Sequence, residues 1–378
     1  MTEARLPGTD IPDFETAAME INMGPQHPST HGVCRLEIVV DGELIQRCRP
    51  EIGYLHRGIE KIAESLSISQ VAVITDRADY LCALNTEFGL MLAAEQLFDV
   101  EIPERADYIR VILAELNRIA NHMMFYGAMG TDSGFSSPFI FAWWNREVIQ
   151  DVLEAVSGAR LLHNYFSLGG LRQDVPADFK DSVAAILPRL ARGIDECVGL
   201  LSDSEVFRVR TRGLNPLTPE EAMSLGLTGP VLRATGIERD LRKLLGYSIY
   251  DKFDFEIPVG TVGDVYERYL MRVLEMRQSI RIIEQALEGM PATGEFVGEV
   301  PRRLRFPAGE VYSRTESPRG ELGIYLVGNG QNTPYRLKIR APAFVHAGAM
   351  EQMLVDAYIP DAVVIFGSVD IVLGEADR

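Results

Sequence analysis

The spacing of apolar side chains divides the 378-residue chain into three kinds of segment. Residues 35–47 alternate apolar and polar positions around an Asp-Gly pair, which predicts an antiparallel hairpin. Further on, apolar positions recur every three or four residues, which predicts helices, and alternation returns near the end of the chain. The predicted helices cover 77–98, 105–124, 137–165, 179–202 and 264–287, and the later strands cover 309–312, 321–327 and 333–341.

The helix predicted over 264–287 has the clearest ends. Asp264 is a capping residue with Glu267 three positions later, and Gly289 and Pro291 end the apolar repeat. Its apolar positions fall on more than one face, which predicts a place in the middle of a helix bundle.

The strand predicted over 333–341 has one apolar face and one basic face. Its basic residues are Arg336, Lys338 and Arg340, which alternate with apolar side chains. Such a face either meets an acidic partner or lies in solvent, and the solvated face is the more common.

Composition narrows the class of protein. Apolar residues make up 47% of the chain, so we expect it to fold, and no apolar run approaches the ~20 residues of a membrane span. The net charge of −17 argues against nucleic acid and against direct adsorption to anionic lipid. The cysteines form no Cys-x-x-Cys pair, which predicts a reduced compartment and no iron–sulfur cluster or zinc held by this chain.

Residues 24–32 place two of the six histidines, His27 and His31, four residues apart in a segment with two prolines and two glycines. A helix is disfavoured there, because proline removes a backbone donor and glycine adds backbone entropy. Imidazole can both hydrogen-bond and deliver a proton near neutral pH. From chemistry alone, a turn with satisfied histidines and a proton-donating site both stay open.

A series of collinear segments gives the chain a family resemblance. Those segments are Gly24–Gly32, Ile52–Gly58, Asp76–Tyr80, Tyr108–Ile112, Glu115–Ile119, Gly158–Arg160, Asp240–Arg242, Glu275–Ser279, Pro318–Gly323, Pro334–Arg336 and Asp370–Arg378. In them the chain resembles the D subunit of bacterial NADH–quinone oxidoreductase, respiratory complex I, a family related to the large subunit of nickel–iron hydrogenases. So many segments in the same order are more specific than any single motif.

The comparison with hydrogenases concerns their two Cys-x-x-Cys pairs, which hold nickel and iron. Here Asp79-x-x-Cys82 and Val372-x-x-Glu375 stand in their places, so three of the four thiolates are missing. What remains does not suit a soft metal centre, and Cys82 is expected to be a buried apolar side chain.

The resemblance implies that the vacated cavity holds the head group of a quinone. The matching residues are His31 and Tyr80, which would hydrogen-bond the two carbonyl oxygens. Asp132 would orient the histidine, and His27 would join it in a proton relay. Without the resemblance, Asp132 among glycine and serine is typical of a turn.

The resemblance also places Arg57 near the terminal iron–sulfur cluster of an adjoining subunit, whereas its spacing from Glu60 equally fits a surface ion pair. The family usually has a histidine two residues after Gly-Ala-Arg, where this chain has Leu162 followed by His163. His163 is the candidate for that place, although on a helix one residue turns a side chain by about 100°.

One stripe of the helix predicted over 105–124 carries polar residues. Glu115, Arg118 and His122 recur there at three- and four-residue spacings. We expect them to form a buried polar network that braces the bundle.

We therefore expect an α+β protein like the hydrogenase large subunit, with an N-terminal β-sheet region, a central antiparallel helix bundle and C-terminal strands. The predicted divisions are an arm at 1–18, a sheet region at 19–60, a helical bundle at 61–308, and a C-terminal strand region with a buried tail at 309–378.

The implied function is that of a quinone-reducing subunit in a proton-translocating NADH–quinone oxidoreductase. The chain alone would bind no cofactor. Quinone would be the substrate, a [4Fe–4S] cluster would lie in an adjacent small iron–sulfur subunit, and FMN and NADH would lie elsewhere in the complex. Other partners would be peripheral-arm and membrane-arm subunits, at the cytoplasmic side of the inner membrane.

Two alternatives stay open. One is the large subunit of a hydrogenase-like or ferredoxin-linked complex. The other is a non-catalytic scaffold paralogue, because Leu162 and a short 289–308 region depart from the family pattern.

Overall fold

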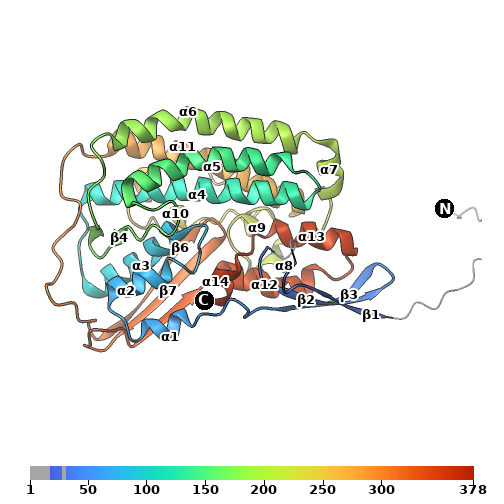
Figure 1. Cartoon of the computed structure of the whole chain (residues 1–378), viewed down its shortest axis with the longest axis horizontal. Helices are drawn as coiled ribbons and strands as arrows, with labels where there is room; N and C mark the ends of the chain where they lie inside the picture. Colours follow the sequence, from blue (N-terminus) through green and yellow to red (C-terminus); the bar gives the residue numbers. More distant parts are fainter. Residues whose placement is uncertain (1–17, 28–30) are drawn as a thin grey trace, which may run out of the picture.

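The computed structural model describes residues 18–27 and 31–378, so the predicted arm at 1–18 lies almost wholly outside the described residues. A layer of long helices covers smaller antiparallel sheets, and the first sheet extends at one end (Figure 1). The predicted α+β class is confirmed.

The strands are β1 (Met19–Met23), β2 (Arg35–Asp41), β3 (Leu44–Glu51), β4 (Phe166–Ser167), β5 (Gly170–Leu171), β6 (Gly309–Ser317), β7 (Gly320–Gly328) and β8 (Arg336–Arg340). The α-helices are α1 (Ile59–Ala63), α2 (Ile68–Thr75), α3 (Ala83–Phe98), α4 (Glu104–Asp132), α5 (Ser137–Ser157), α6 (Phe179–Cys197), α7 (Glu205–Thr211), α8 (Pro219–Ser224), α9 (Pro230–Arg233), α10 (Leu241–Leu244), α11 (Val265–Gly289), α12 (Pro342–Met353), α13 (Ile359–Ser368) and α14 (Leu373–Asp377).

The N-terminal sheet has the strand order β1-β2-β3, with antiparallel neighbours. The predicted hairpin is confirmed, because β2 and β3 pair across a turn in which Gly42 has a φ of 62°. Leu36, Ile38 and Val40 on β2 are buried, while most residues between them are partly exposed. The alternation in the sequence therefore reflects one buried face and one partly exposed face.

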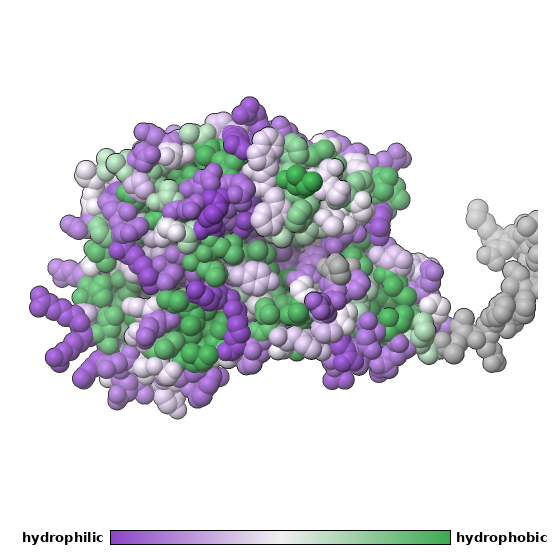
Figure 2. Space-filling model, in the orientation of Figure 1, coloured by the Kyte–Doolittle hydropathy of each residue, from purple (hydrophilic) through white to green (hydrophobic). Residues whose placement is uncertain are grey.

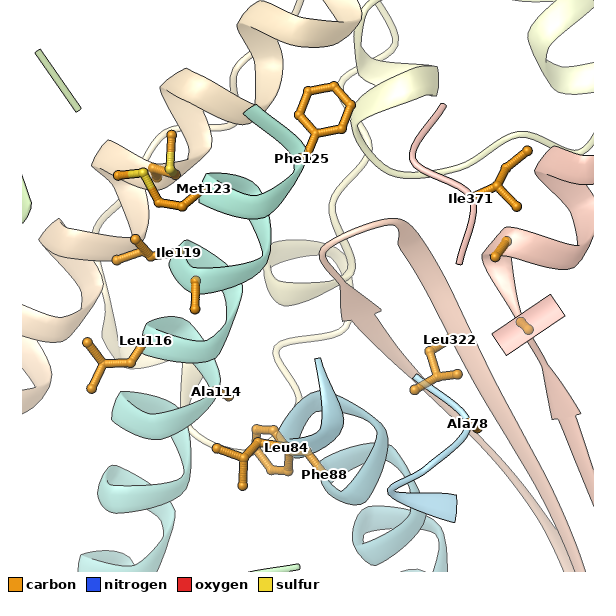
Figure 3. Packing of buried hydrophobic residues seen from close by; sticks show 14 of the residues in the cluster. Ala78, Leu84, Phe88, Ala114, Leu116, Ile119, Met123, Phe125, Leu322 and Ile371 are labelled. Carbon is orange, nitrogen blue, oxygen red and sulfur yellow. The ribbon is translucent and has the colours of Figure 1, made fainter. Parts of the chain in front are cut away.

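The helix bundle is built from α4, α5, α6 and α11 (Figure 1). The predicted cap of α11 is confirmed, since Asp264 Oδ1 accepts a hydrogen bond from the backbone N–H of Glu267 at 2.8 Å. As its two-sided apolar pattern predicts, α11 packs against several helices, α4 and α6 among them. Figure 3 shows Leu116, Ile119 and Met123 of α4 on the side of that helix which faces α11.

Several predicted helix ends are wrong. The first long helix begins at Ala83 rather than at residue 77, because residues 76–82 form turns. The helix α4 continues for eight residues beyond residue 124, to Asp132. In contrast, α5 stops at Ser157, because Gly158 takes a left-handed φ of 81° and ends it.

The C-terminal sheet has the order β6-β7-β8, and α3 packs across it. Its basic strand has an acidic partner within the same chain: Arg336 pairs with Glu64 at 3.0 Å and Lys338 with Glu60 at 2.9 Å. The side chains of Arg336 and Lys338 are 46% and 48% exposed, so the interpretation as a solvated face is confirmed, and the ion pairs on that face are made with the short helix α1 and the residue that follows it.

The C-terminal strands predicted within 309–341 are confirmed as β6, β7 and β8, and the residues after 341 form the helices α12, α13 and α14. The last of these is buried, with Glu375 1% and Asp377 6% exposed. Within the described part of the chain, no helix is both long and apolar enough to cross a bilayer. Polar and apolar side chains are interspersed over the face shown in Figure 2.

Candidate functional site

A cavity of about 300 Å³ lies where the C-terminal half of α4 meets the start of α5 and the segment before α14. Its walls are mostly apolar, and its titratable groups come from four separate parts of the chain. The lining residues are His31, Tyr80, Leu81, Met124, Phe125, Ala128, Thr131, Asp132, Phe139, Asp370, Ile371 and Val372. The structure thus brings together three of the predicted site residues, His31, Tyr80 and Asp132, around one cavity.

The imidazole of His31 is bound to Asp132, with 2.7 Å between Nε2 and Oδ2. Asp132 is the last residue of α4, and the partial negative charge of a helix C-terminus also favours a cation beside it. Gly367 leaves room for the pair, because a Cβ there would lie 2.5 Å from Asp132 Oδ2. The edge of Phe366 contacts the imidazole, with ring centroids 5.9 Å apart.

This environment favours the protonated form of His31. Burial lowers the pKa of His31, but the hydrogen bond and charge of Asp132, with the charge of Asp370, outweigh burial and raise the pKa above 6.5. The imidazolium therefore persists to a higher pH than it would in water.

Tyr80 occupies the turn before α3 and lines the cavity from another side. Its ring rests on Gly374 of α14, where an added Cβ would lie 2.8 Å from Tyr80 Cε1. Among the described residues, its hydroxyl has no hydrogen-bond partner. Burial raises the pKa of Tyr80, with Arg319 and Arg57 opposing, so the phenol remains a donor.

Asp370 is a cavity residue for which the sequence predicted no role. It sits at a left-handed φ of 57°, and its Oδ2 lies 3.5 Å from Arg319 Nε and 3.3 Å from Asn121 Nδ2. Burial raises the pKa of Asp370, but Arg319 and Arg272 outweigh it and lower the pKa. The available signal was its place at the start of the matching segment Asp370–Arg378.

The predicted polar network in the bundle is confirmed. Arg118 Nε lies 3.1 Å from Glu115 Oε2, and His122 Nε2 lies 3.2 Å from Glu275 Oε2. Arg242 bridges the two carboxylates at 3.0 and 2.9 Å. Burial raises the pKa of Glu275, but the surrounding cations outweigh it and hold the pKa well below its usual value.

Three of the predicted site residues do not line the cavity. His27 is exposed and forms a backbone bridge with Gly32, while the rest of the histidine loop, 28–30, lies outside the described residues. Arg57 is exposed and donates to the carbonyl of Arg77 at 2.5 Å, so the alternative ion pair with Glu60 does not form.

His163 lies in the loop after α5 and is 6% exposed. The argument from a one-residue turn on a helix is wrong, because Leu162 has a left-handed φ of 59°. Burial lowers the pKa of His163 to about 4, and its Nδ1 lies 3.0 Å from the carbonyl oxygen of Ala159. The ring is therefore neutral near pH 7.

Cys82 is fully buried and receives a hydrogen bond from Asn85 Nδ2 at 3.0 Å. Burial raises its pKa well above 9.0, so it is a thiol at neutral pH. Over residues 18–27 and 31–378, no three histidine, cysteine or acidic side chains gather in a way that would hold a metal ion.

Fold and cavity together define an α+β protein with a largely apolar small-molecule cavity between a helix bundle and its own C-terminal segment. Residues 132–304 and 297–378 match the family model described as the respiratory-chain NADH dehydrogenase 49 kDa subunit, and the chain belongs to that family.

Curated relatives match over nearly the whole chain. The protein named as the D subunit of NADH-quinone oxidoreductase in Geobacillus thermodenitrificans (strain NG80-2) is 46% identical over 364 residues, which is 96% of this chain and 100% of the relative. One of the same name from Carboxydothermus hydrogenoformans is 44% identical over 364 residues, again 96% and 100%. Another from Dehalococcoides mccartyi (strain BAV1) is 46% identical over 366 residues, 97% of this chain and 100% of the relative.

Proposed function

We propose that this chain is the quinone-reducing subunit of an NADH–quinone oxidoreductase of the complex I type, and that its cavity holds the quinone ring. The observation that carries the proposal is the convergence of His31, Asp132 and Tyr80 on one cavity. Family membership and the names of the full-length relatives support the same function.

The chemistry of the cavity fits that substrate. Reduction of a quinone adds two electrons and two protons, so its two carbonyl oxygens become hydroxyls. His31 and Tyr80 offer one acidic hydrogen each, from an imidazolium and from a phenol without a partner among the described residues. A donor binds a reduced, more basic oxygen more strongly than a carbonyl oxygen, so these bonds favour the reduced state.

The apolar walls suit the rest of the ring. Phe125, Phe139, Met124 and Ile371 surround the polar groups with side chains that compete for no hydrogen bonds. A cavity of this kind binds a flat apolar molecule and fixes its orientation through a few polar contacts.

The electrons would come from a partner. Arg57 is exposed on the loop before α1, where a cation is available to a neighbouring subunit. We place the small iron–sulfur subunit with its [4Fe–4S] cluster against this region, with FMN and NADH in other subunits. The chain would be peripheral at the cytoplasmic side of the inner membrane, in contact with membrane-arm subunits, and would take part in proton translocation.

The test is quinone reduction by the assembled complex with Y80F or H31Q. Y80F removes only the hydroxyl, and we expect either change to lower the rate about 10- to 100-fold, the effect of losing a hydrogen bond worth about 1.5–3 kcal/mol. Y335F is the matched control, because Tyr335 is 65% exposed and does not line the cavity.

NADH oxidation by ferricyanide and the subunit content of the purified complex report assembly in each variant. Wild-type quinone turnover in both Y80F and H31Q, in fully assembled complex, would favour a scaffold and refute the proposed function.

A further inference from the structure

Three buried carboxyl groups surround one guanidinium behind the cavity wall. Asp79, Asp370 and Glu375 are 1%, 6% and 1% exposed, and Arg319 is 0% exposed. They come from the turn before α3, the segment before α14, α14 itself and the β6–β7 turn. The helix α14 that brings Glu375 packs against α12 (Figure 1).

Two of the three carboxyls have the partners that an ionised carboxylate needs. Asp79 receives Arg319 Nη1 at 2.5 Å on one oxygen and the backbone N–H groups of Leu81 and Cys82 on the other. Asp370 faces Arg319 Nε at 3.5 Å. Arg319 thereby commits its charge to these two groups.

Glu375 lacks such partners. Its Oε2 accepts one hydrogen bond, from the backbone N–H of Ala343 at 3.2 Å. Its Oε1 is buried and has no hydrogen-bond partner within the described chain, and no cation there lies within ion-pair distance of it. Arg319 already pairs with two carboxylates, so an ionised Glu375 would be a buried charge without a paired cation, which is strongly disfavoured.

Burial raises the pKa of Asp79 as well as that of Glu375, but of these two only Asp79 has a guanidinium and two backbone N–H groups that stabilise its charge. Burial and the charges of Asp79 and Asp370 raise the pKa of Glu375 to about 8, with Arg319 opposing. The thiol of Cys82 stays protonated, because burial raises its pKa well above 9.0. Glu375 is therefore the group of the cluster that binds and releases a proton near neutral pH.

The cluster is attached to the cavity through Tyr80. Asp79 immediately precedes Tyr80, and Gly374, which immediately precedes Glu375, forms the surface on which the Tyr80 ring rests. Asp370 belongs both to the cluster and to the cavity lining. A charge change at Glu375 thus occurs one residue from the surface that supports the Tyr80 ring, and beside a carboxylate that lines the cavity.

We propose that Glu375 is a neutral carboxylic acid that stores a proton for the cavity and restores the proton that Tyr80 gives up; this rests on the proposed function. When a reduced oxygen takes the Tyr80 proton, the phenol O–H bond breaks and a quinol O–H bond forms. The Glu375 O–H bond then breaks as the phenol O–H re-forms, leaving a carboxylate that solvent reprotonates. The electrons are those of the oxidoreductase reaction.

The experiment uses E375Q and E375D in the assembled complex, with quinone reduction measured from roughly pH 6 to pH 10. Wild-type turnover should fall as the pH passes about 8, because Glu375 loses its proton. E375Q keeps the acceptor for Ala343 but cannot ionise. Its kcat should be lowered about tenfold or more, with unchanged KM, and its alkaline decline should differ from that of the wild type, because only the titration of His31 then remains.

The control is D377N, in the same buried helix. Asp377 binds the backbone N–H groups of Gly53 and Leu55, outside the cluster. D377N should keep the wild-type midpoint of the alkaline decline, whatever its effect on stability. E375D keeps an ionisable group at a shorter reach, so its decline should remain but at a displaced midpoint, and it replaces E375Q if the amide variant does not assemble.

A second measurement does not depend on turnover. The infrared spectrum of wild-type complex at pH 7 should contain a protonated-carboxyl C=O band that E375Q lacks. A wild-type pH profile in E375Q or E375D, or the absence of that band, overturns the proposal even if Y80F and H31Q lose activity. If those two variants keep full activity while the band is present, the proposed function fails and Glu375 is still a neutral acid.

Discussion

Gly374 is the point at which a single methyl group would test how closely the cavity must fit. A Cβ at this position would lie 2.8 Å from Tyr80 Cε1 and 2.8 Å from the carbonyl oxygen of Ala78. The φ of Gly374 is not in the left-handed region, so alanine is compatible with the backbone and acts through these contacts alone.

The magnitude follows from the overlap. Carbon atoms in contact lie about 3.5 Å apart, so the Tyr80 ring or the α14 backbone must shift by roughly 0.7 Å. Overpacking of this kind costs about 1–3 kcal/mol of stability. A displacement approaching 1 Å of a positioned group lowers a rate by up to about 100-fold. For G374A we therefore expect kcat/KM for quinone to fall about 10- to 100-fold.

The assay is quinone reduction by the assembled complex, with ferricyanide reduction as the measure of assembly. G348A is the matched control, because Gly348 lies inside α12 and a Cβ there meets nothing within 4 Å. It should gain about 0.5–1 kcal/mol of stability, from the better helix propensity of alanine, and leave quinone reduction unchanged. Wild-type kinetics in G374A would refute the idea that α14 positions Tyr80.

Further variants test the other parts of the site. D132N removes the charge that raises the pKa of His31, so burial should dominate and the pH–rate profile should shift to lower pH. Because the folded-state pKa is raised, the pair stabilises the fold below pH 6.5 and loses this effect as the pH rises through that pKa; thermal melts of D132N should lack this pH dependence. E275A leaves Arg242 buried with less compensation, and chemical denaturation should show a loss of about 3–5 kcal/mol. R336A removes an exposed ion pair, and its melting curve should report less than about 1 kcal/mol.

Local periodicity predicted the bundle and the first hairpin, because each of these elements has one buried face and one face that is more exposed to solvent. It failed at the end of α4, where Gly127 and Gly130 resemble a break in the helix. Both glycines are inside the helix because α5 lies against them: a Cβ on Gly130 would be 2.8 Å from Pro138 Cβ. These glycines are required by a contact with another element, and no local pattern in the sequence records that contact. The last helical turns of α4, which were not predicted, place Asp132 at the cavity.

The helices α12–α14 were missed for a related reason. Most of α13 and all of α14 are buried, and the exposed stripe of α12 begins with the apolar Phe344, which is 45% exposed, so apolar and polar residues follow no amphipathic period there. A segment buried all round has neither the 3.6-residue nor the two-residue repeat that identifies helices and strands.

The site residues also divide into those that could be predicted from the sequence and those that depend on contacts in the fold. Taken by itself, Asp132 in a Gly-Ser segment favoured a turn, and chemistry alone left the histidine loop undecided; only the family resemblance joined His31, Tyr80 and Asp132. Even that assigned nothing to Asp370, Gly367 or Gly374. Their roles depend on their neighbours in the fold. Asp370 is a carboxylate in the cavity wall, and the two glycines leave room for a neighbouring side chain.

The C-terminal segment from Gly367 onward contacts each part of the site from a different direction. Gly367 makes room for the His31–Asp132 pair, Gly374 supports Tyr80, and the Asp377 carboxylate receives the N–H groups of Gly53 and Leu55 at 2.8 and 2.7 Å. Backbone N–H groups bound to a carboxylate are among the stronger hydrogen bonds, so this contact holds the loop that carries the exposed arginine before α1. Docking of one buried segment therefore aligns the cavity residues and the loop that carries Arg57 together, and a change that loosens α14 should affect both.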